Sequence, residues 1–251
     1  MTADDLTGRV AIVTGSTAGL GARFAHVLAG AGATVVVTGR RTDRIREVVE
    51  SIGRSGGKAH GVRLDVTDPA SIEDCLTGVT EQIGLPQILV NNAGIPDAQR
   101  AHKMSLELVD AVLDTNVRGP WLMATGVARR LIEAGVPGRI VNITSMSAYQ
   151  YDGNGAALYS TTKAAVSRMT EALAVEWSRK FINVNAIAPG VFASEMTDGM
   201  LARVGDIAPG LPRQRLGQPE QIDSTLLYLV SDASEAVTGT VIKIDDGQLP
   251  R

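Results

Sequence analysis

Short β-branched runs alternate with longer amphipathic segments along the whole chain, and this alternation restricts the possible folds most strongly. The runs predicted as strands span residues 9–14, 34–38, 59–66, 87–91, 139–144, 182–188 and 240–244. The segments predicted as helices span residues 19–31, 42–54, a stretch that begins at 69, 106–134, 157–179 and 219–231. Strands separated by helices need crossover connections, which give a parallel sheet with both faces covered. The pattern predicts an α/β fold: a single doubly wound domain over residues 1–251, with about seven parallel strands.

Two prolines add local detail to this prediction. Asp68 followed by Pro69 is typical of an N-cap with proline at the first helical position. Gly119-Pro120 lies inside the long helical stretch 106–134, and we expect the helix to break there because proline has no N–H to donate.

Composition limits the class of partner and the compartment. The chain has a net charge of −3 and no block of basic residues, which argues against a nucleic-acid partner or an anionic membrane surface. Cys75 is the only cysteine, and His26 and His60 have no partner at ligand spacing, so no disulfide and no metal site are predicted. The first residues do not resemble a signal peptide, and no apolar run is long enough to cross a bilayer. We therefore expect a cytoplasmic protein.

A glycine-rich loop, residues 14–21, joins the first predicted strand to the first predicted helix. Sheets of this kind bind ligands beyond the carboxyl ends of their strands. Glycines let the backbone turn tightly and approach a pyrophosphate, and the helix N-terminus offers free N–H groups. The spacing is G-x-x-x-G-x-G and not the commoner G-x-G-x-x-G. The residues expected to bind a dinucleotide here are Gly15, Ser16, Thr17, Gly19, Leu20 and Gly21.

The end of the second predicted strand indicates which dinucleotide binds. An NAD site usually places a carboxylate there to bond the ribose 2′-hydroxyl, but this chain has Gly39 followed by Arg40 and Arg41. Arginine binds a 2′-phosphate well, so the pattern favours NADP(H), with Arg40 the better candidate. The alternative is that both arginines are ordinary solvated charges in front of a helix.

Two further strand ends are placed to meet the cofactor. Asp65 and Val66 close the third strand and are candidates for contact with the adenine. Asn92, Ala93 and Gly94 close the fourth, where small residues would admit a flat ring. The alternative for this second group, which begins at Asn91, is a simple turn.

Tyr159 and Lys163 are four residues apart on a predicted helix and therefore share one face. An unperturbed tyrosine titrates near ~10, and a neighbouring ammonium favours the phenolate and lowers that pKa. Ser145, at the end of the fifth strand, supplies a hydroxyl that can bond a carbonyl oxygen. The alternatives are a packed tyrosine beside a solvated lysine, and an ordinary turn serine.

Together these motifs resemble the short-chain dehydrogenase/reductase family over essentially the whole chain. The matching signatures are the glycine loop at 14–21, Asn91-Asn92-Ala93-Gly94, Asn116 within 113–117, Ser145 with Tyr159 and Lys163, and Pro189-Gly190. The chain looks most like bacterial reductases related to 3-oxoacyl-carrier-protein reductase and to polyol and gluconate dehydrogenases. The resemblance implies a Rossmann-type domain and an oxidoreductase that transfers a hydride between NADP(H) and a ketone or secondary alcohol.

The resemblance also implies a role for each catalytic residue. Tyr159 would give its proton to the substrate oxygen during reduction and take it during oxidation. Ser145 would hold that oxygen, and Lys163 would bond the nicotinamide ribose and lower the Tyr159 pKa. Asn116 would support a water that links Lys163 to solvent.

At the nicotinamide end the resemblance implies contacts from Pro189, Gly190, Val191 and Ser194, the last standing where the family usually has threonine. Two other positions depart from the family pattern. Ala18 occupies a loop position that is often basic in NADP-preferring members. Asp246 stands where the family usually has a glycine, and aspartate tolerates a left-handed backbone better than most residues.

Residues 194–216 are expected to form a substrate lid. Met146 and a tyrosine, Tyr149 or Tyr151, would wall the pocket, and the lid residues Met196, Met200 and Leu201 would roof it. No arginine or lysine lies between Ser145 and Tyr159, which favours neutral, partly apolar substrates over small sugar acids. The alternative is an arginine that reaches in from the lid: Arg203, Arg213 or Arg215.

The helices at 106–134 and 157–179 are apolar nearly all round, so each should bury a second face against another subunit. The family's tetramers imply a homotetramer.

Two other functions stay open. One is an NAD-dependent secondary-alcohol dehydrogenase, for a polyol or sugar acid, with the same catalytic residues. The other is a non-catalytic nucleotide-sensing protein, which would be expected to lack the tyrosine or the lysine.

Overall fold

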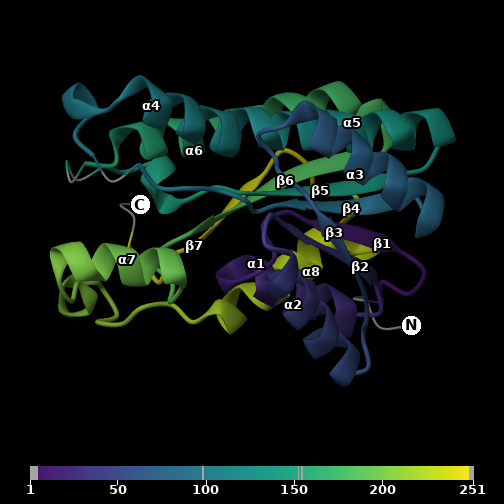
Figure 1. Cartoon of the computed structure of the whole chain (residues 1–251), viewed down its shortest axis with the longest axis horizontal. Helices are drawn as coiled ribbons and strands as arrows, with labels where there is room; N and C mark the ends of the chain where they lie inside the picture. The colour runs from purple at the N-terminus through teal and green to yellow at the C-terminus, as the bar shows by residue number, and fades with distance from the viewer. Residues whose placement is uncertain (1–4, 98, 152, 154, 249–251) are drawn as a thin grey trace.

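The computed structural model describes residues 5–97, 99–151, 153 and 155–248, and its centre is a seven-stranded sheet (Figure 1). The strand order is β3-β2-β1-β4-β5-β6-β7, and every neighbouring pair is parallel. The strands are β1 (Val10–Val13), β2 (Thr34–Gly39), β3 (Lys58–Arg63), β4 (Pro86–Asn91), β5 (Gly138–Ile143), β6 (Ile182–Pro189) and β7 (Val241–Ile244). The predicted doubly wound α/β fold is confirmed.

Helices cover both faces of the sheet (Figure 1). On one face lie α1 (Gly19–Gly30), α2 (Thr42–Arg54) and α8 (Asp223–Val230). On the other lie α3 (Pro69–Gln82), α4 (Leu106–Leu113), α5 (Gly119–Ala134) and α6 (Ala157–Trp177). The strand order reverses between β1 and β4, and sheets of this kind bind ligands outside the carboxyl ends of the strands at that point.

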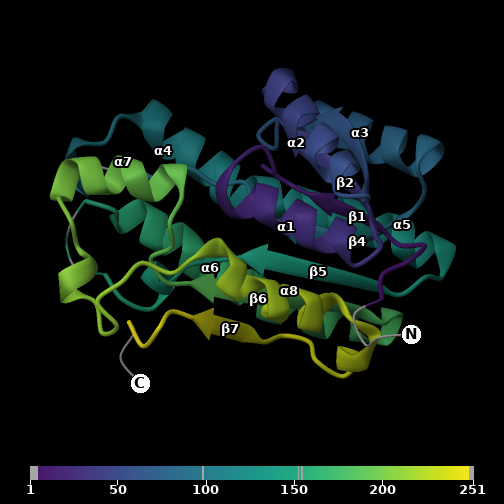
Figure 2. The same ribbon diagram turned by 90° about the horizontal axis from the view of Figure 1, so that it is seen from below.

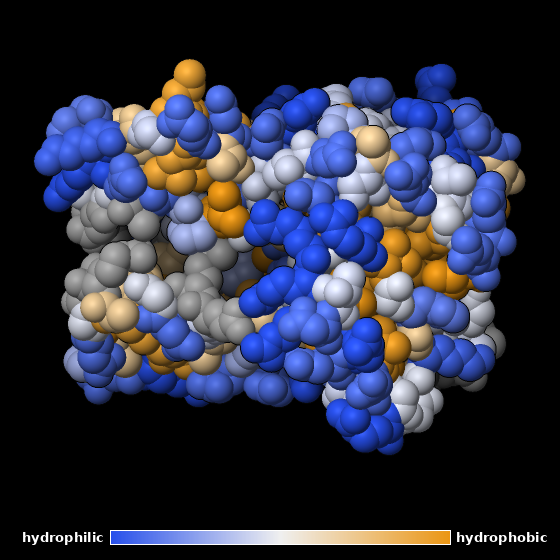
Figure 3. All heavy atoms as spheres, in the orientation of Figure 1, coloured by the Kyte–Doolittle hydropathy of each residue, from blue (hydrophilic) through white to orange (hydrophobic). Residues whose placement is uncertain are grey.

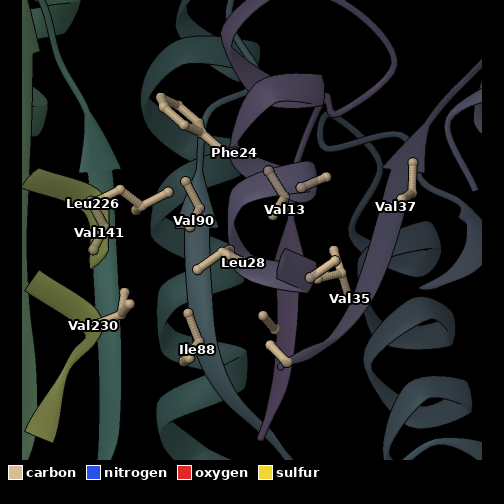
Figure 4. Packing of buried hydrophobic residues seen from close by; sticks show 14 of the residues in the cluster. Val13, Phe24, Leu28, Val35, Val37, Ile88, Val90, Val141, Leu226 and Val230 are labelled. Atoms are coloured by element: carbon tan, nitrogen blue, oxygen red, sulfur yellow. The ribbon is translucent and has the colours of Figure 1, made fainter. Parts of the chain in front are cut away.

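The core consists of two hydrophobic layers, one on each side of the sheet. Along β1, Ala11 and Val13 pack into the first layer, and Val10 and Ile12 pack into the second. They alternate because successive side chains of a strand point to opposite faces. Figure 4 shows the first layer, where side chains of α1 and α8 meet those of β1, β2, β4 and β5. Burial on both faces explains why these strands are continuous apolar runs.

We expected the helix predicted over 106–134 to break at Gly119-Pro120, but it does not. It continues through a π-helical turn, η2 (Asp114–Arg118), which joins α4 to α5, and the N–H of Gly119 bonds the carbonyl of Asp114. An α-helix would direct the N–H of residue 120 to the carbonyl of residue 116, and proline has no N–H to do so. The chain accommodates this loss by widening one turn around Asn116, a type of irregularity frequent at functional sites.

Three other segments complete the comparison with the predicted elements. Strand β3 ends at Arg63 rather than at Val66, because the N–H of Asp65 turns away to bond Ser71 Oγ at 3.0 Å. Asp68 caps α3 as predicted, accepting the N–H of Ala70. An unpredicted helix, α7 (Glu195–Val204), occupies the expected lid. Among the described residues, no helix combines the length and apolar character needed to cross a membrane.

Candidate active site

The glycine loop after β1 approaches the end of β4 so closely that no side chain fits between them. A Cβ placed on Gly21 would lie 2.4 Å from Asn92 Nδ2 and 2.4 Å from the carbonyl oxygen of Gly15. Gly15 and Gly19 have φ angles of +62° and +53°, which favour glycine. The loop leads into the N-terminus of α1, whose free N–H groups suit an anionic pyrophosphate.

Thr14 and Asn92 fasten the glycine loop to β4. Asn92 Nδ2 donates to the carbonyls of Thr14 at 3.0 Å and Gly15 at 3.1 Å. Thr14 Oγ1 accepts the N–H groups of Asn92 at 3.0 Å and Ala93 at 3.1 Å. The Asn-Asn-Ala-Gly segment is therefore more than a simple turn, because it fixes the shape of the predicted cofactor loop.

Ser16 is buried, and its N–H and its hydroxyl both bond inside the protein. Its N–H donates to the carbonyl of Thr38 at 2.9 Å, and its hydroxyl donates to the carbonyl of Val13 and accepts the N–H of Thr38, both at 2.8 Å. The prediction that Ser16 binds the cofactor does not fit these contacts. Ser16 instead ties the glycine loop to β1 and β2.

The ends of β2 and β3 form a region of mixed charge. Arg40 and Arg41 are both exposed, and Arg41 directly precedes α2. Burial opposes ionisation of Asp65, but hydrogen bonds from Thr67 and the charges of Arg40 and Arg63 bring the net pKa of Asp65 below its ordinary value. Arg40 is therefore close enough to Asp65, in the segment that follows β3, for its charge to lower the Asp65 pKa.

Gly39, just before Arg40, packs against the glycine loop. A Cβ placed on Gly39 would lie 2.7 Å from Thr17 Cγ2. A carboxylate side chain at this position, typical of NAD sites, would therefore need Thr17 to move. Val66, in the segment after β3, is buried. Its carbonyl oxygen would lie 2.8 Å from a Cβ on Gly119, so this segment packs against the start of α5.

Three predicted catalytic side chains meet where β5 and α6 approach each other. The Ser145 hydroxyl is close enough to the Tyr159 hydroxyl to lower the pKa of Tyr159. Lys163 Nζ lies 5.5 Å from the centre of the Tyr159 ring and donates to the carbonyl of Ile143 at 2.9 Å. Because Lys163 is only 5% exposed, the alternative of a solvated lysine is wrong.

Burial controls the protonation of this pair. It raises the pKa of Tyr159, the hydrogen bond with Ser145 lowers it, and the charge of Asp97 adds to the rise. Burial also lowers the pKa of Lys163 to about 8. The expectation that Lys163 brings the Tyr159 pKa below its ordinary value is therefore not met, because desolvation of the phenolate dominates.

Asn116, buried in the π turn, holds the segment that follows β4. Its Oδ1 accepts the N–H of Ile95 and its Nδ2 donates to the carbonyl of Ile95, both at 2.9 Å. A Cβ placed on Gly94 would lie 3.4 Å from Asn116 Oδ1 and 3.5 Å from Lys163 Nζ. Asn116 thus lies beside the lysine, with its side chain bound to protein backbone.

The comparisons with known proteins agree with this arrangement. Residues 15–248 match the sequence profile of the family described as enoyl-(acyl carrier protein) reductase. The chain is 37% identical to a 3-oxoacyl-[acyl-carrier-protein] reductase of Aquifex aeolicus over 96% of its length and 98% of the relative's. It superposes with a TM-score of 0.95 on a short-chain type dehydrogenase/reductase from Mycobacterium marinum, at 36% identity, covering 99% of this chain and 98% of that one. The chain belongs to the short-chain dehydrogenase/reductase family.

A further solved structure bears on the site. It is a gluconate 5-dehydrogenase from Burkholderia cenocepacia in complex with NADP and tartrate, with a TM-score of 0.92. The identity is 29%, and the match covers 99% of this chain and 98% of that one. The predicted resemblance to acyl-carrier-protein reductases and gluconate dehydrogenases is confirmed, and the chain is an oxidoreductase.

In this short-chain dehydrogenase/reductase, the segment after β6 is held by a residue that the motifs do not include. Gln248 Oε1 accepts the N–H of Val191 at 2.8 Å, and a Cβ on Gly190 would lie 2.5 Å from the same oxygen. Pro189-Gly190-Val191 is therefore fixed from the far end of the chain. No local pattern near Gln248 indicates this contact.

The lid begins against the glycine loop. Ser194 caps α7 by accepting the N–H of Thr197 at 3.2 Å, and its Cβ would lie 3.5 Å from a Cβ on Gly19. Ser194 is thus close to the loop, as the predicted nicotinamide contact requires, although its hydroxyl is also a helix cap. α7 lies beyond the carboxyl ends of the strands (Figure 2), and the surface is hollowed between α7 and the layer that contains α4 (Figure 3).

The predicted pocket walls are only partly accounted for. Tyr149 and Tyr151 are 46% and 45% exposed, and Lys243 Nζ lies 4.4 Å from the centre of the Tyr149 ring. The side chains of Met196 and Arg203 lie outside the described residues. A substrate contact from either tyrosine stays a prediction.

A network of buried side-chain amides connects the strands and helices that carry the site. Asn91 Nδ2 donates to Asn142 Oδ1 at 2.9 Å and to the carbonyl of Pro120 at 3.2 Å. Asn142 Nδ2 in turn donates to Thr170 Oγ1 at 2.9 Å. The network links β4, β5, α5 and α6, and its sequence signal is an asparagine inside each of two apolar strand runs.

Proposed function

We propose that this oxidoreductase transfers a hydride between NADP(H) and a ketone or secondary alcohol, with Tyr159 as the general acid and base. The observation that supports this most is the meeting of Ser145, Tyr159 and Lys163 beside the segment that holds the glycine loop. Residues for cofactor binding and for proton transfer thus share one edge of the sheet.

The residues present fit an NADP(H) cofactor. Gly15, Gly19 and Gly21 keep the loop free of side chains at its closest approaches. Arg40 offers an exposed guanidinium for a 2′-phosphate, and the packing of Gly39 disfavours a carboxylate beside it. When bound, the cofactor supplies the hydride chemistry, and the chain binds, orients and moves the proton.

The proton transfer follows from the protonation of Tyr159. Because its pKa is raised, chiefly by burial, the phenol stays protonated at neutral pH, which is the form that donates a proton to a substrate oxygen during reduction. Ser145, whose hydroxyl is close enough to the phenol to lower its pKa, would hold that oxygen. Oxidation needs the phenolate, so oxidation should accelerate as the pH rises. Below about pH 8, Lys163 is protonated, so its charge would stabilise the phenolate that remains after Tyr159 has donated its proton.

A panel of ketones and secondary alcohols, assayed with NADPH and NADH at neutral and alkaline pH, tests the proposal. We expect reduction with a higher kcat/KM for NADPH, and oxidation that increases with pH. A higher kcat/KM with NADH would instead support the NAD-dependent alcohol dehydrogenase. Binding of NADPH without turnover of any substrate would support the nucleotide-sensing protein.

We also propose a neutral, partly apolar substrate. The two lid arginines whose side chains are described are both engaged by one carboxylate: Arg215 Nε donates to Asp246 Oδ2 at 2.8 Å, and Arg213 Nη1 lies 3.3 Å from Asp246 Oδ1. Ion pairing in this way opposes their use in holding a substrate carboxylate. The relative from Burkholderia cenocepacia is named for gluconate, so an anionic substrate is the outcome that would contradict this choice.

Exposed apolar side chains support assembly into a homotetramer. Val175 on α6 is 77% exposed and Trp121 on α5 is 46% exposed. Leu106 and Leu113 add to them on α4, where apolar residues stand out in Figure 3. Large apolar side chains left exposed on neighbouring helices are a feature of protein interfaces. Light scattering should give the mass of four chains, and Val175→Glu should lower it; a monomer at micromolar concentration would refute the proposal.

A further inference from the structure

Asp97, in the segment after β4, is a buried carboxylate that no sequence motif includes. It is only 3% exposed, and its Oδ2 accepts the N–H of Leu158 at 2.9 Å and the N–H of Tyr159 at 3.1 Å. Because 61 and 62 residues separate these partners in the sequence, the contacts exist only in the folded chain. Asp97 therefore bonds directly to the backbone of the proposed catalytic tyrosine.

These two N–H groups belong to the first turn of α6, where a helix has no acceptors of its own. The residue that precedes a helix usually supplies a side-chain oxygen for them, but here that residue is Ala156, which makes no such bond. A carboxylate from a distant segment takes its place, and its negative charge suits the positive end of the helix dipole. Asp97 thus fixes where α6 begins.

The segment that contains Asp97 is itself fixed from the π turn. Asn116 binds both the N–H and the carbonyl of Ile95, two residues earlier, and also donates to Thr162 Oγ1 on α6 at 3.2 Å. Residues 95–97 therefore connect η2 to the first turn of α6. A displacement of this segment would move the tyrosine relative to Ser145 and Lys163.

We propose that Asp97 is a positioning residue for proton transfer, which holds the first turn of α6 so that the Tyr159 hydroxyl meets Ser145 and the substrate oxygen. The inference rests on the proposed role of Tyr159. The backbone N–H of Tyr159 needs a hydrogen-bond acceptor, and Asp97 supplies it. None of the motif residues has this function.

The charge of Asp97 has a second effect on the same phenol. A negative charge disfavours the phenolate, so Asp97 adds to the rise of the Tyr159 pKa that burial causes, while Ser145 opposes it. Lys163 is the charged group of α6 near the ring. The loop before α6 contributes two described titratable groups: Tyr149, whose ring faces Lys243, and Tyr151, whose hydroxyl accepts the N–H of Gly155. Removing the charge of Asp97 should therefore make Tyr159 ionise at lower pH.

Two variants separate the position of Asp97 from its charge. Asp97→Asn keeps an oxygen acceptor and removes the charge, whereas Asp97→Ala removes both. Asp97→Ala should lower kcat by about 10- to 100-fold, as expected for a misplaced catalytic group, with a smaller change in the KM for cofactor. Asp97→Asn should retain more of kcat and should shift the pH profile of oxidation to lower pH.

Asp68→Ala is the matched control for Asp97→Ala, because the carboxylate of Asp68 also caps the start of a helix, with its Oδ1 2.9 Å from the N–H of Ala70 on α3. It should leave kcat and the pH profile unchanged. An equal loss of kcat in Asp68→Ala and Asp97→Ala would overturn the proposal, because general destabilisation would then explain both.

A second readout does not depend on turnover. Ultraviolet absorbance follows the ionisation of the four tyrosines, and the difference from Tyr159→Phe isolates Tyr159. We expect Tyr159 to titrate at lower pH in Asp97→Asn than in the unmodified protein. An unchanged titration would overturn the inference even if Asp97→Ala fails to fold. If the unmodified protein reduces no carbonyl, the proposed function fails, and the titration still decides the effect of Asp97 on Tyr159.

Discussion

The glycine loop and the lid border the same candidate site, but different interactions hold them. The loop is fixed by buried hydrogen bonds from Asn92 and Thr14 and by backbone contacts that exclude a Cβ. The later part of the lid is held by ion pairs from Arg213 and Arg215, whose side chains are 64% and 46% exposed. Exposed ion pairs contribute about 0–1 kcal/mol each, while an overpacked core position costs ~1–3 kcal/mol. Substitutions in the loop should therefore have much larger effects than substitutions in the lid.

The largest effect is expected at Tyr159, the proposed general acid and base. Tyr159→Phe removes the transferable proton and keeps the ring, so kcat should fall by about 10²- to 10⁴-fold while cofactor binding persists. Tyr228→Phe, at a residue of α8 that is 45% exposed, is the control and should leave kcat unchanged. Steady-state kinetics of the two variants measure this, and near-normal turnover by Tyr159→Phe would remove the proposed role.

The parts of the site that the sequence predicted are those set by local geometry. The spacing of Tyr159 and Lys163 places both on one face of any helix, and the glycine positions follow from the turn that the loop must make. Asp68 was predicted as a cap because its acceptor and its donors lie within one turn. Each of these inferences needs only neighbouring residues, and the structure agrees with each.

The parts that the sequence did not predict depend on distant segments. Gln248 bonds Val191, and Asp97 caps α6, across separations of 57 residues and about 60. The sequence does not predict the lid helix α7, because Gly199 lies in the middle of its segment and glycine is unfavourable inside a helix. The Tyr159 pKa was expected to fall because the sequence shows the nearby lysine but not the burial that outweighs it.

The close approach within the glycine loop gives the next largest expected effect. Gly21→Ala places a methyl group 2.4 Å from Asn92 Nδ2, so it should destabilise the protein by ~1–3 kcal/mol and weaken NADPH binding. Gly53→Ala is the control, because it lies on α2 with nothing within 4 Å of its Cβ position. It should stabilise by ~0.5–1 kcal/mol. Chemical denaturation and NADPH titration of both variants decide; similar results for the two would contradict the packing argument.

Cofactor preference should change less than catalysis does. Arg40→Asp removes a guanidinium and adds a charge that repels a 2′-phosphate, so kcat/KM with NADPH should fall by about 10- to 100-fold, the range for lost hydrogen bonds to charged groups. With NADH it should improve. Arg46→Asp makes the same change of charge at an exposed position of α2 and should affect both cofactors equally. An unmodified protein that prefers NADH would contradict the assignment before any substitution is made.

The smallest effect is expected where the lid meets the segment after β7, because there Asp246 combines a strained backbone with ion pairs to two lid arginines. Its φ of +49° lies in the left-handed region, as the sequence pattern allowed, and a residue with a side chain pays ~1–2 kcal/mol there that glycine does not. Asp246→Gly relieves this strain and loses the pairs with Arg213 and Arg215, whose exposed bonds contribute a similar small amount. Stability should therefore change little.

The two freed arginines would, however, become available to an anionic substrate. We expect kcat/KM for a sugar acid to rise by less than about tenfold, the equivalent of 1.4 kcal/mol, and kcat/KM for a matched neutral alcohol to stay constant. Asp246→Asn, which loses the charge and keeps the side chain, should reproduce the substrate change without the gain from relieved strain. Two results would contradict this: an unmodified protein that already prefers the sugar acid, or variants that leave the ratio of kcat/KM for sugar acid and neutral alcohol unchanged. Asp246 would then not keep the arginines from the substrate, and the weak, exposed ion pairs of the lid would give no selection against negative charge.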